Sequence, residues 1–208
     1  FINFAVKVFY CVIIIIFIDI NEIVMKILNL EFTISQIVCL ILYYGIAIYL
    51  PKSQTILFGK LSRHIRVYLC RHIFKKCGRQ VNIERGAVFG RGTDVEIGDY
   101  SGIGVNAHIP CDAKIGNFVM MAPNCYIHNV NHNFSDISTP MCMQGFSEKK
   151  GVVIEDDCWI GRDVIMTPGR TIKRGSVIGT GCVLCKDFPE YSIVGGNPSK
   201  LIRLRNNN

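Results

Sequence analysis

The sequence predicts an all-β solenoid of hexapeptide repeats, with an N-terminal helical extension and one loop that leaves the coil. The first observation is an aliphatic residue at every sixth position, from Ile97 to Ile127 and again from Ile154 to Leu184. A helix has a period of about 3.6 residues and a plain strand alternates every second residue. The repeat therefore favours short extended segments between corners, as in a β-helix.

The second observation is what stands between the aliphatic residues. Glycine, Asn and Asp recur where corners are expected, and these residues tolerate tight bends. An antiparallel sandwich, the alternative, would show period-two alternation in longer strands. In most coils a small residue follows the aliphatic one by four places and is expected to point inward as well: Ser101, Ala107, Ala113, Val119, Cys125, Cys158, Val164, Ser176 and Cys182.

The N-terminal part is apolar. Residues 8–18 form an unbroken apolar run, which is shorter than the ~20 residues of a spanning helix. Met25 resembles a natural start, so we treat residues 1–24 as an extension that need not belong to the native chain. A second apolar run, 34–50, contains polar residues and ends before Pro51. It predicts a docked or surface-lying helix, with a membrane span as the alternative.

A basic amphipathic helix is expected over residues 61–77. Apolar residues recur there at helical spacing, and Gly78 would end the helix. The net charge of +7 gathers here, within a predicted helical region 25–80. The helix could cap the solenoid with a solvated basic face, or bind an anionic membrane surface or a phosphorylated sugar carrier. Nucleic acid is not expected, because no aromatic-interleaved basic groove accompanies the charge.

Ten cysteines are present, but their positions do not indicate a disulfide framework. Cys125, Cys158 and Cys182 occupy the small inward position, where cysteine behaves as a small hydrophobe. Cys182 and Cys185 form a lone CxxC, which leaves a zinc or redox site as the alternative. A reducing cytoplasm is the simpler interpretation.

The repeat is interrupted between Ile127 and Ile154, which predicts an extruded loop over residues 128–151. Functional residues concentrate in loops held by a rigid scaffold. This loop contains His128 and His132, and histidine can accept a proton at neutral pH. A histidine that only bonds to loop backbone is the alternative for either one.

Several segments in order resemble the hexapeptide-repeat O-acetyltransferases. They read IGNFVMMAPN from Ile115, HNF from His132, DCWIG from Asp157, IGTGCV from Ile178 and YSIVGGNPSK from Tyr191. The resemblance covers about residues 81–205. It is nearest to the maltose and galactoside acetyltransferases and to the sugar acetyltransferases of capsule, exopolysaccharide and lipopolysaccharide pathways.

The resemblance implies a left-handed parallel β-helix that assembles as a homotrimer, with acetyl-CoA between neighbouring coils and no metal. Residues 81–205 would be the acyltransferase domain. His132 matches the family's catalytic base, which takes the proton of a sugar hydroxyl as that oxygen attacks the thioester. Surface polysaccharide synthesis in a bacterial cytoplasm is the expected setting, with possible membrane contact through the N-terminal region.

The resemblance also assigns candidate binding residues. Trp159 would pack on the pantetheine arm, and the backbone amides of Arg162 and Thr180 would bond to it. Lys186, Lys200 and Arg203 stand where cations could meet the CoA phosphates, with a solvated charge run as the alternative. Asn106 and Asn131 are the candidate acceptor contacts.

Three positions depart from the family pattern. Arg170 stands at an inward position, so it must exit at a corner or find a carboxylate. Glu155 replaces a usual glycine and would strain its corner if a positive φ were required there. Gly104 replaces the Asn that holds the sugar in the galactoside branch.

Two other functions compete with acetyl transfer. A γ-type carbonic anhydrase would bind zinc through three histidines, and His108, His128 and His132 invite that comparison. However, two of them lie on an irregular loop. A silent scaffold is the third reading, since fold alone does not establish activity.

Overall fold

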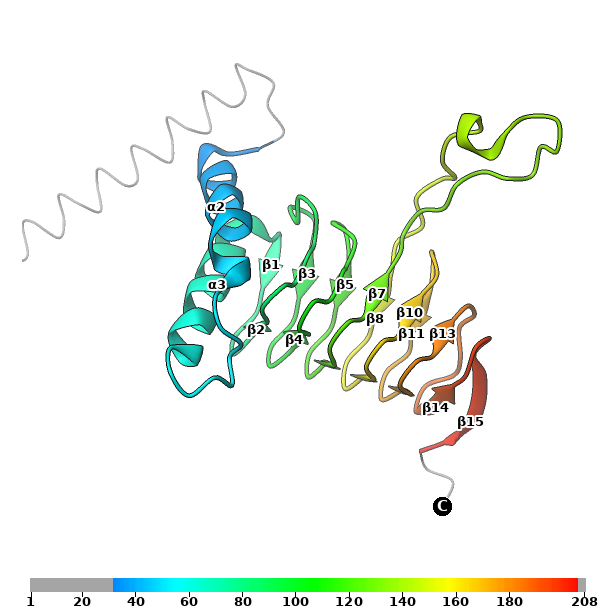
Figure 1. Ribbon diagram of the computed structural model, residues 1–208. Coiled ribbons are helices and arrows are strands. Elements are labelled where there is room, and N and C mark those ends of the chain that lie inside the picture. The colour runs from blue at the N-terminus through cyan, green and yellow to red at the C-terminus, as the bar shows by residue number, and fades with distance from the viewer. Residues whose placement is uncertain (1–31, 206–208) are drawn as a thin grey trace, which may run out of the picture.

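The computed structural model describes residues 32–205, which form a helical cap followed by a parallel β-solenoid (Figure 1). The expected extension 1–24 and the apolar run 8–18 lie outside the described residues. The helical elements are α2 (Ile34–Gly45), η1 (Ala47–Tyr49), α3 (Gly59–Ile73) and η2 (Met141–Met143). The strands are β1 (Lys76–Cys77), β2 (Asn82–Ile83), β3 (Glu96–Ile97), β4 (Gly102–Ile103), β5 (Lys114–Ile115), β6 (Met120–Met121), β7 (Tyr126–Ile127), β8 (Val153–Ile154), β9 (Trp159–Ile160), β10 (Ile165–Met166), β11 (Thr171–Ile172), β12 (Val177–Ile178), β13 (Val183–Leu184), β14 (Ser192–Gly195) and β15 (Lys200–Leu204).

The strands stack into three faces of a prism. The first face has the order β1-β3-β5-β8-β11. The second face combines β2-β4 with β6-β9-β12-β14-β15, joined where the Gly102 amide donates to the Val119 carbonyl at 3.0 Å. The third face contains β7-β10-β13 and is extended by single bridges through His108. All these pairings are parallel except the last, β14 with β15, and the predicted solenoid is confirmed.

The six-residue repeat forms the core. Ile97 pairs with Ile115, and Ile115 pairs with Ile154, so one aliphatic column runs along the first face. All nine predicted small inward residues are also buried. Burial of an aliphatic side chain contributes about 1.5–3 kcal/mol, so neighbouring coils stabilise each other.

The basic helix α3 ends at Ile73, earlier than expected from the sequence. Phe74 is already extended, and Lys76 and Cys77 form the first strand, in register with Glu96 and Ile97. Gly78 therefore does not cap a helix. A Cβ at Gly78 would lie 2.6 Å from the carbonyl carbon of Gly98, so close stacking of coils requires glycine there. The solenoid begins at Lys76, ahead of the expected boundary at Val81.

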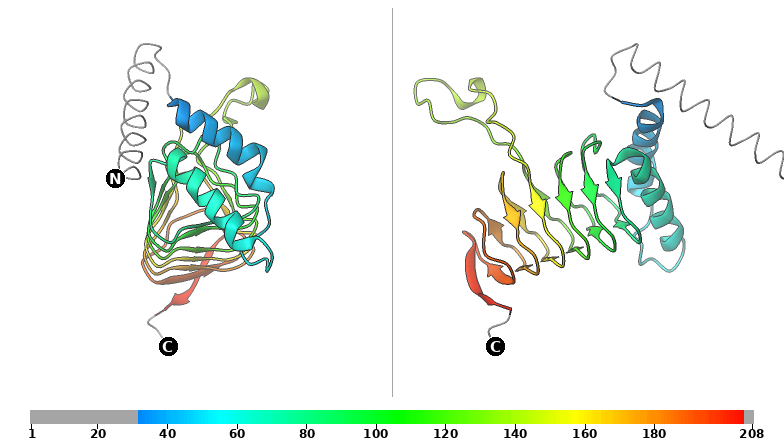
Figure 2. Two further views of the ribbon diagram at one scale, coloured as in Figure 1. Left: turned by 90° about the vertical axis from the view of Figure 1, so that its left-hand side faces the viewer. Right: turned by 180° about the vertical axis from the view of Figure 1, so that it is seen from behind.

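Helices α2 and α3 lie side by side across the N-terminal end of the prism, as Figure 2 shows. Tyr43 of α2 is buried and donates from its hydroxyl to the Ala87 carbonyl at 2.9 Å. Arg66 of α3 is also buried and donates to the carbonyls of Ile83 (2.6 Å) and Pro51 (3.0 Å). The run 34–50 is thus a docked helix, and none of the helices within residues 32–205 has the length and apolar character needed to cross a bilayer.

Candidate active site

The predicted loop leaves the coil between β7 and β8 and extends far from the prism (Figure 1). Its two arms are bonded to each other near the base. The Ser147 amide donates to the Asn131 carbonyl at 2.8 Å, and the Asn133 amide donates to the Gly145 carbonyl at 3.0 Å. These bonds give the base of the loop a defined shape although no coil supports it.

His132 lies within this paired base. It forms an antiparallel bridge with Phe146, and the centroids of the two rings are 4.4 Å apart. The imidazole is exposed, and within residues 32–205 neither ring nitrogen has a hydrogen-bond partner. Packing against Phe146 orients the ring while leaving its nitrogens available to a substrate.

Polar groups surround His132 in a shallow hollow. Asn131, Asn133, Ser147 and Thr167 contribute to its lining. The sequence analysis singled out Asn131 but missed Phe146, Ser147 and Thr167, because no periodic signal marks loop residues that meet across two arms. Asn131 is exposed and Ser147 and Thr167 are partly exposed, and amide and hydroxyl groups of this kind suit an acceptor that carries several hydroxyls.

The far part of the loop is held by local hydrogen bonds. The Gln144 side-chain amide donates to the carbonyls of Asp136 and Thr139, both at 2.7 Å. The Asp136 carboxylate accepts from the Ser138 hydroxyl at 2.6 Å and from the Ser138 amide at 2.8 Å. Hydrogen bonds from the Ser138 and Thr139 side chains lower the pKa of Asp136 to about 2.

Trp159, Arg162 and Thr180 lie together on neighbouring coils. The indole of Trp159 is about half exposed (52%) on the second face. Arg162 and Thr180 follow at the corner between the second and third faces, where the Gly181 amide donates to the Arg162 carbonyl at 2.8 Å. A Cβ at Gly161 would lie 2.6 Å from the Thr180 nitrogen, so glycine keeps this amide uncovered. An exposed indole beside corner amides fits a pantetheine arm.

Two of the predicted cations are neighbours. The Cys185 amide donates to the Ser199 hydroxyl at 3.2 Å, so Lys186 and Lys200 follow directly after two residues that are in contact. The Lys186 ammonium lies 5.5 Å from the centroid of the Phe188 ring. Arg203 is further along β15, and one of its guanidinium nitrogens donates to the Leu204 carbonyl at 3.2 Å. These cations fit phosphate groups.

His132 and Trp159 belong to different sides of the prism. The loop starts after β7 on the third face and returns to β8 on the first, whereas Trp159 stands on β9 of the second face. Within one chain the catalytic candidate and the candidate CoA residues are therefore not brought to a common face.

The corner before the third face explains the departure at Gly104. A Cβ there would clash with the carbonyl oxygen of Ala122, so the family's Asn has no room in this chain. Asn106, two positions on, has a φ of 53° and an exposed side chain that donates to the Asn124 carboxamide oxygen at 3.4 Å. Asn106 therefore places a polar side chain at the corner where Gly104 has none.

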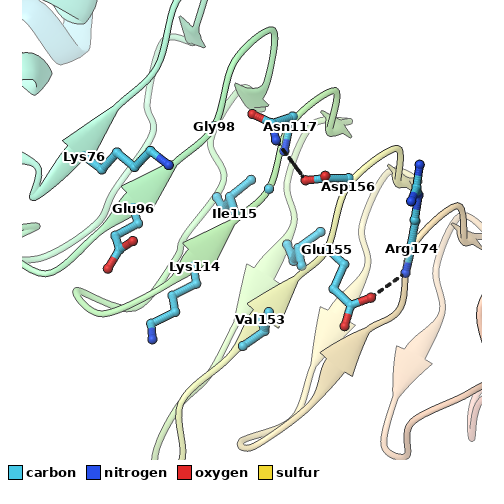
Figure 3. A pocket seen from close by; sticks show the side chains of 12 residues that line it. Lys76, Glu96, Gly98, Lys114, Ile115, Asn117, Val153, Glu155, Asp156 and Arg174 are labelled. Carbon is cyan, nitrogen blue, oxygen red and sulfur yellow. Dashed lines mark hydrogen bonds between the residues drawn. The ribbon is translucent and has the colours of Figure 1, made fainter.

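The expected strain at Glu155 is absent. The positive φ in this corner falls on Asp157 (56°), and Glu155 instead accepts from the Lys173 ammonium at 2.8 Å. Glu155 also accepts from the Arg174 amide at 2.9 Å (Figure 3). Asp156 accepts from the Asn117 amide at 2.6 Å. The hollow drawn in Figure 3 is lined by these coil-to-coil contacts, which are structural.

Arg170 both exits at a corner and finds a carboxylate, the two possibilities that the sequence left open. It leaves the coil at a corner, with about a quarter of its side chain exposed (27%). Its guanidinium pairs with the Asp187 carboxylate at 3.5 Å. No unpaired guanidinium is buried here.

The histidines proposed for zinc do not converge in this chain. The Tyr126 ring lies between His108 and His128, with centroid distances of 4.7 and 4.6 Å. No group of three metal-binding side chains is found among residues 32–205. Cys125, Cys158 and Cys182 are buried free thiols as expected, and burial raises the pKa of Cys125 and Cys158 to about 11.

Comparison with known proteins gives the family. No family model matches the chain. A chloramphenicol acetyltransferase of Agrobacterium fabrum is 32% identical over 157 residues, covering 74% of this chain and 69% of that one. A maltose O-acetyltransferase structure from Clostridium difficile is 27% identical with a TM-score of 0.65, covering 82% and 86%.

A second solved structure bears on the co-substrate. The hexapeptide-repeat acetyltransferase VCA0836 of Vibrio cholerae, complexed with acetyl-CoA, is 26% identical with a TM-score of 0.61, covering 73% and 80%. Acetyl-CoA is therefore the co-substrate that the relatives support for this acyltransferase. The six-residue repeat, the solenoid fold and the relatives together show that the chain belongs to the hexapeptide-repeat acetyltransferase family.

Proposed function

We propose that this protein transfers an acetyl group from acetyl-CoA to a hydroxyl of a sugar or sugar derivative, with His132 as general base. The observation that carries the proposal is the exposed imidazole of His132, oriented by Phe146 in a hollow lined by amides and hydroxyls. Similarity to a maltose O-acetyltransferase supports a sugar acceptor. Asn131 and Asn106 are the proposed acceptor contacts.

The reaction needs one proton transfer to histidine and no acyl-enzyme. An imidazole nitrogen of His132 takes the proton of the acceptor hydroxyl as that oxygen attacks the thioester carbonyl. The carbon–sulfur bond then breaks, and the proton leaves with the CoA thiol. A general base contributes about 10²- to 10⁴-fold in rate, and holding both substrates together adds more.

The site is proposed to form between copies of the chain. His132 and Trp159 face different sides of one prism, so a neighbouring copy must supply the missing half. A homotrimer with three shared sites meets this requirement, because a cyclic assembly repeats one contact until it closes. The CoA arm would lie along Trp159 and the amides of Arg162 and Thr180, with Lys186, Lys200 and Arg203 at the phosphates.

The setting is proposed from the acceptor class. A sugar O-acetyltransferase that uses cytoplasmic acetyl-CoA fits the modification of precursors of bacterial surface polysaccharides. The acceptor would then be a free, nucleotide-linked or lipid-linked sugar.

The experiment is release of CoA thiol with a panel of sugars, sugar nucleotides and chloramphenicol. Thiol release that depends on a sugar should fall about 10²- to 10⁴-fold in His132→Ala. His128→Ala is the matched control and should change the rate by less than about tenfold, because the His128 ring packs on Tyr126 at the coil and not in the hollow. Unchanged release in His132→Ala would contradict the assigned base, and release with chloramphenicol alone would contradict the sugar.

A further inference from the structure

The charge of this protein is segregated along the chain. Residues 32–83, which include the whole cap, contain eight Lys or Arg and no Asp or Glu. Residues 84–208 contain thirteen of each sign. Six of the eight precede the first strand, at Lys76, and lie in the helical cap, so most of the positive excess belongs to the cap.

The cap also exposes apolar side chains on the side that faces away from the coil. Tyr43, Leu69 and Ile73 are buried toward the prism, but both helices present a second apolar face outward. Figure 2 shows the two helices that carry this face lying across the N-terminal end of the prism. Its exposed members are Ile34, Ile37, Val38, Ile41 and Leu42 of α2 and Leu61, Ile65 and Tyr68 of α3. An exposed apolar face shared by two packed helices is typical of an interaction site.

The turn between the two helices adds the most exposed part of the face. Ile56, Leu57 and Phe58 follow one another there, and Ile56 is fully exposed (105%). The exposed lysines Lys52 and Lys60 flank them on both sides. Three consecutive apolar residues between two lysines form a protrusion that suits an apolar layer bordered by negative charge.

We propose that the outer face of the cap docks on an anionic membrane surface. The apolar side chains of the turn, α2 and α3 would enter the boundary between headgroups and acyl chains, while Lys52 and Lys60 pair with lipid phosphates. A second copy of the chain is the weaker occupant, because two such faces would bring Lys52 and Lys60 of both copies together, and residues 32–83 contain no Asp or Glu that could pair with them across the contact.

Docking in this orientation leaves the proposed chemistry free. The cap closes the N-terminal end of the prism, whereas β14 and β15 close the opposite end and the loop projects from coils between them (Figure 1). The inference does not depend on the proposed function, because binding to lipid can be measured without acetyl transfer.

The experiment is flotation of the full chain with vesicles of phosphatidylcholine alone or mixed with phosphatidylglycerol. The wild-type chain should bind the anionic vesicles, and binding should weaken as salt rises, because salt screens the lysine–phosphate attraction. Ile56→Ser/Leu57→Ser should reduce the bound fraction about tenfold. Phe58 is left unchanged because it is the N-cap residue of α3 and has a positive φ of 63°.

Two further variants sharpen the result. Lys52→Glu/Lys60→Glu should abolish the preference for anionic vesicles. Ile137→Ser is the matched control, because Ile137 is equally exposed but lies on the loop, and its binding should equal that of the wild type. Equal binding by wild type and Ile56→Ser/Leu57→Ser, equal binding to both kinds of vesicle, or concentration-dependent self-association through the cap would each overturn the proposal.

Discussion

The coils and the loop that leaves them are held together in different ways. In the coils, Ile97 and Ile115 repeat the same buried environment one rung apart. In the loop, side chains such as Gln144 bond to nearby backbone, and the ring of His132 remains exposed. The coils therefore supply stability, and the loop carries the proposed catalytic base. Substitutions in the two regions should affect different measurements.

The largest expected effect on stability is in the aliphatic column. Ile97→Ala should lower the free energy of unfolding by about 2–5 kcal/mol, because Ile97 is fully buried and neighbouring rungs cannot collapse into the cavity. Urea unfolding measures this change. His132→Ala should leave the unfolding curve unchanged, and a loss of similar size in that variant would erase the distinction between coil and loop.

A pair of glycines tests the same distinction through backbone packing. Gly78→Ala should cost about 1–3 kcal/mol, because its Cβ would press on Gly98 and Asp99 of the next coil. Gly151→Ala, at the return of the loop, has open space around the new methyl group and should cost nearly nothing. Thermal unfolding of the two variants compares them, and equal melting temperatures would contradict the stacking argument.

Substitution of Phe146 tests whether the loop acts on activity and not on stability. Phe146→Ala removes the ring that orients His132 and should lower kcat about tenfold, since a misplaced catalytic group loses rate. KM for the acceptor should change less. Phe146→Tyr keeps the aromatic contact and should restore most of kcat. If Phe146→Ala instead lowered stability with kcat unchanged, Phe146 would belong to the fold and not to the positioning of the base.

The smallest expected effect is at Glu155, where the coil resumes after the loop. The hydrogen bond from Lys173 lowers the pKa of Glu155. The ion pair therefore stabilises the fold above the unfolded value near 4.3 and is lost as the pH falls through the folded pKa. Glu155→Gln should cost less than about 1 kcal/mol at pH 7, because both side chains are partly exposed. Urea unfolding at pH 7 and pH 3 should show this difference shrink in acid, and a difference as large at pH 3 as at pH 7 would exclude the ion pair as its cause.

Much of the coil could be predicted because its contacts repeat. Ile97, Ile103 and Ile109 are six positions apart and occupy equivalent inward positions, so their spacing alone predicts the faces and the core. The error at Gly78 came from the edge of the pattern. Cys77 and Gly78 occupy the positions in the first coil that Ile97 and Gly98 occupy in the next. However, they also follow an amphipathic run whose spacing is typical of a helix.

The loop could be located but not built from the sequence. The break after Ile127 gave its place, and resemblance singled out His132. His132 contacts Phe146 across the two arms of the loop, and Asp136 bonds to the nearby Ser138. Neither contact follows a sequence period, so neither could be predicted. Arg170 shows the same limit, since its partner Asp187 lies in the following coil at no repeated spacing.

The most direct test of the account mixes two inactive chains. His132→Ala damages the loop half of the proposed site, and Trp159→Ala/Lys200→Glu damages the CoA half. If the halves meet between copies, equal mixing during refolding should restore about a quarter of the sites, measured as sugar-dependent thiol release. Activity no greater than that of the separate variants would contradict a site shared between chains.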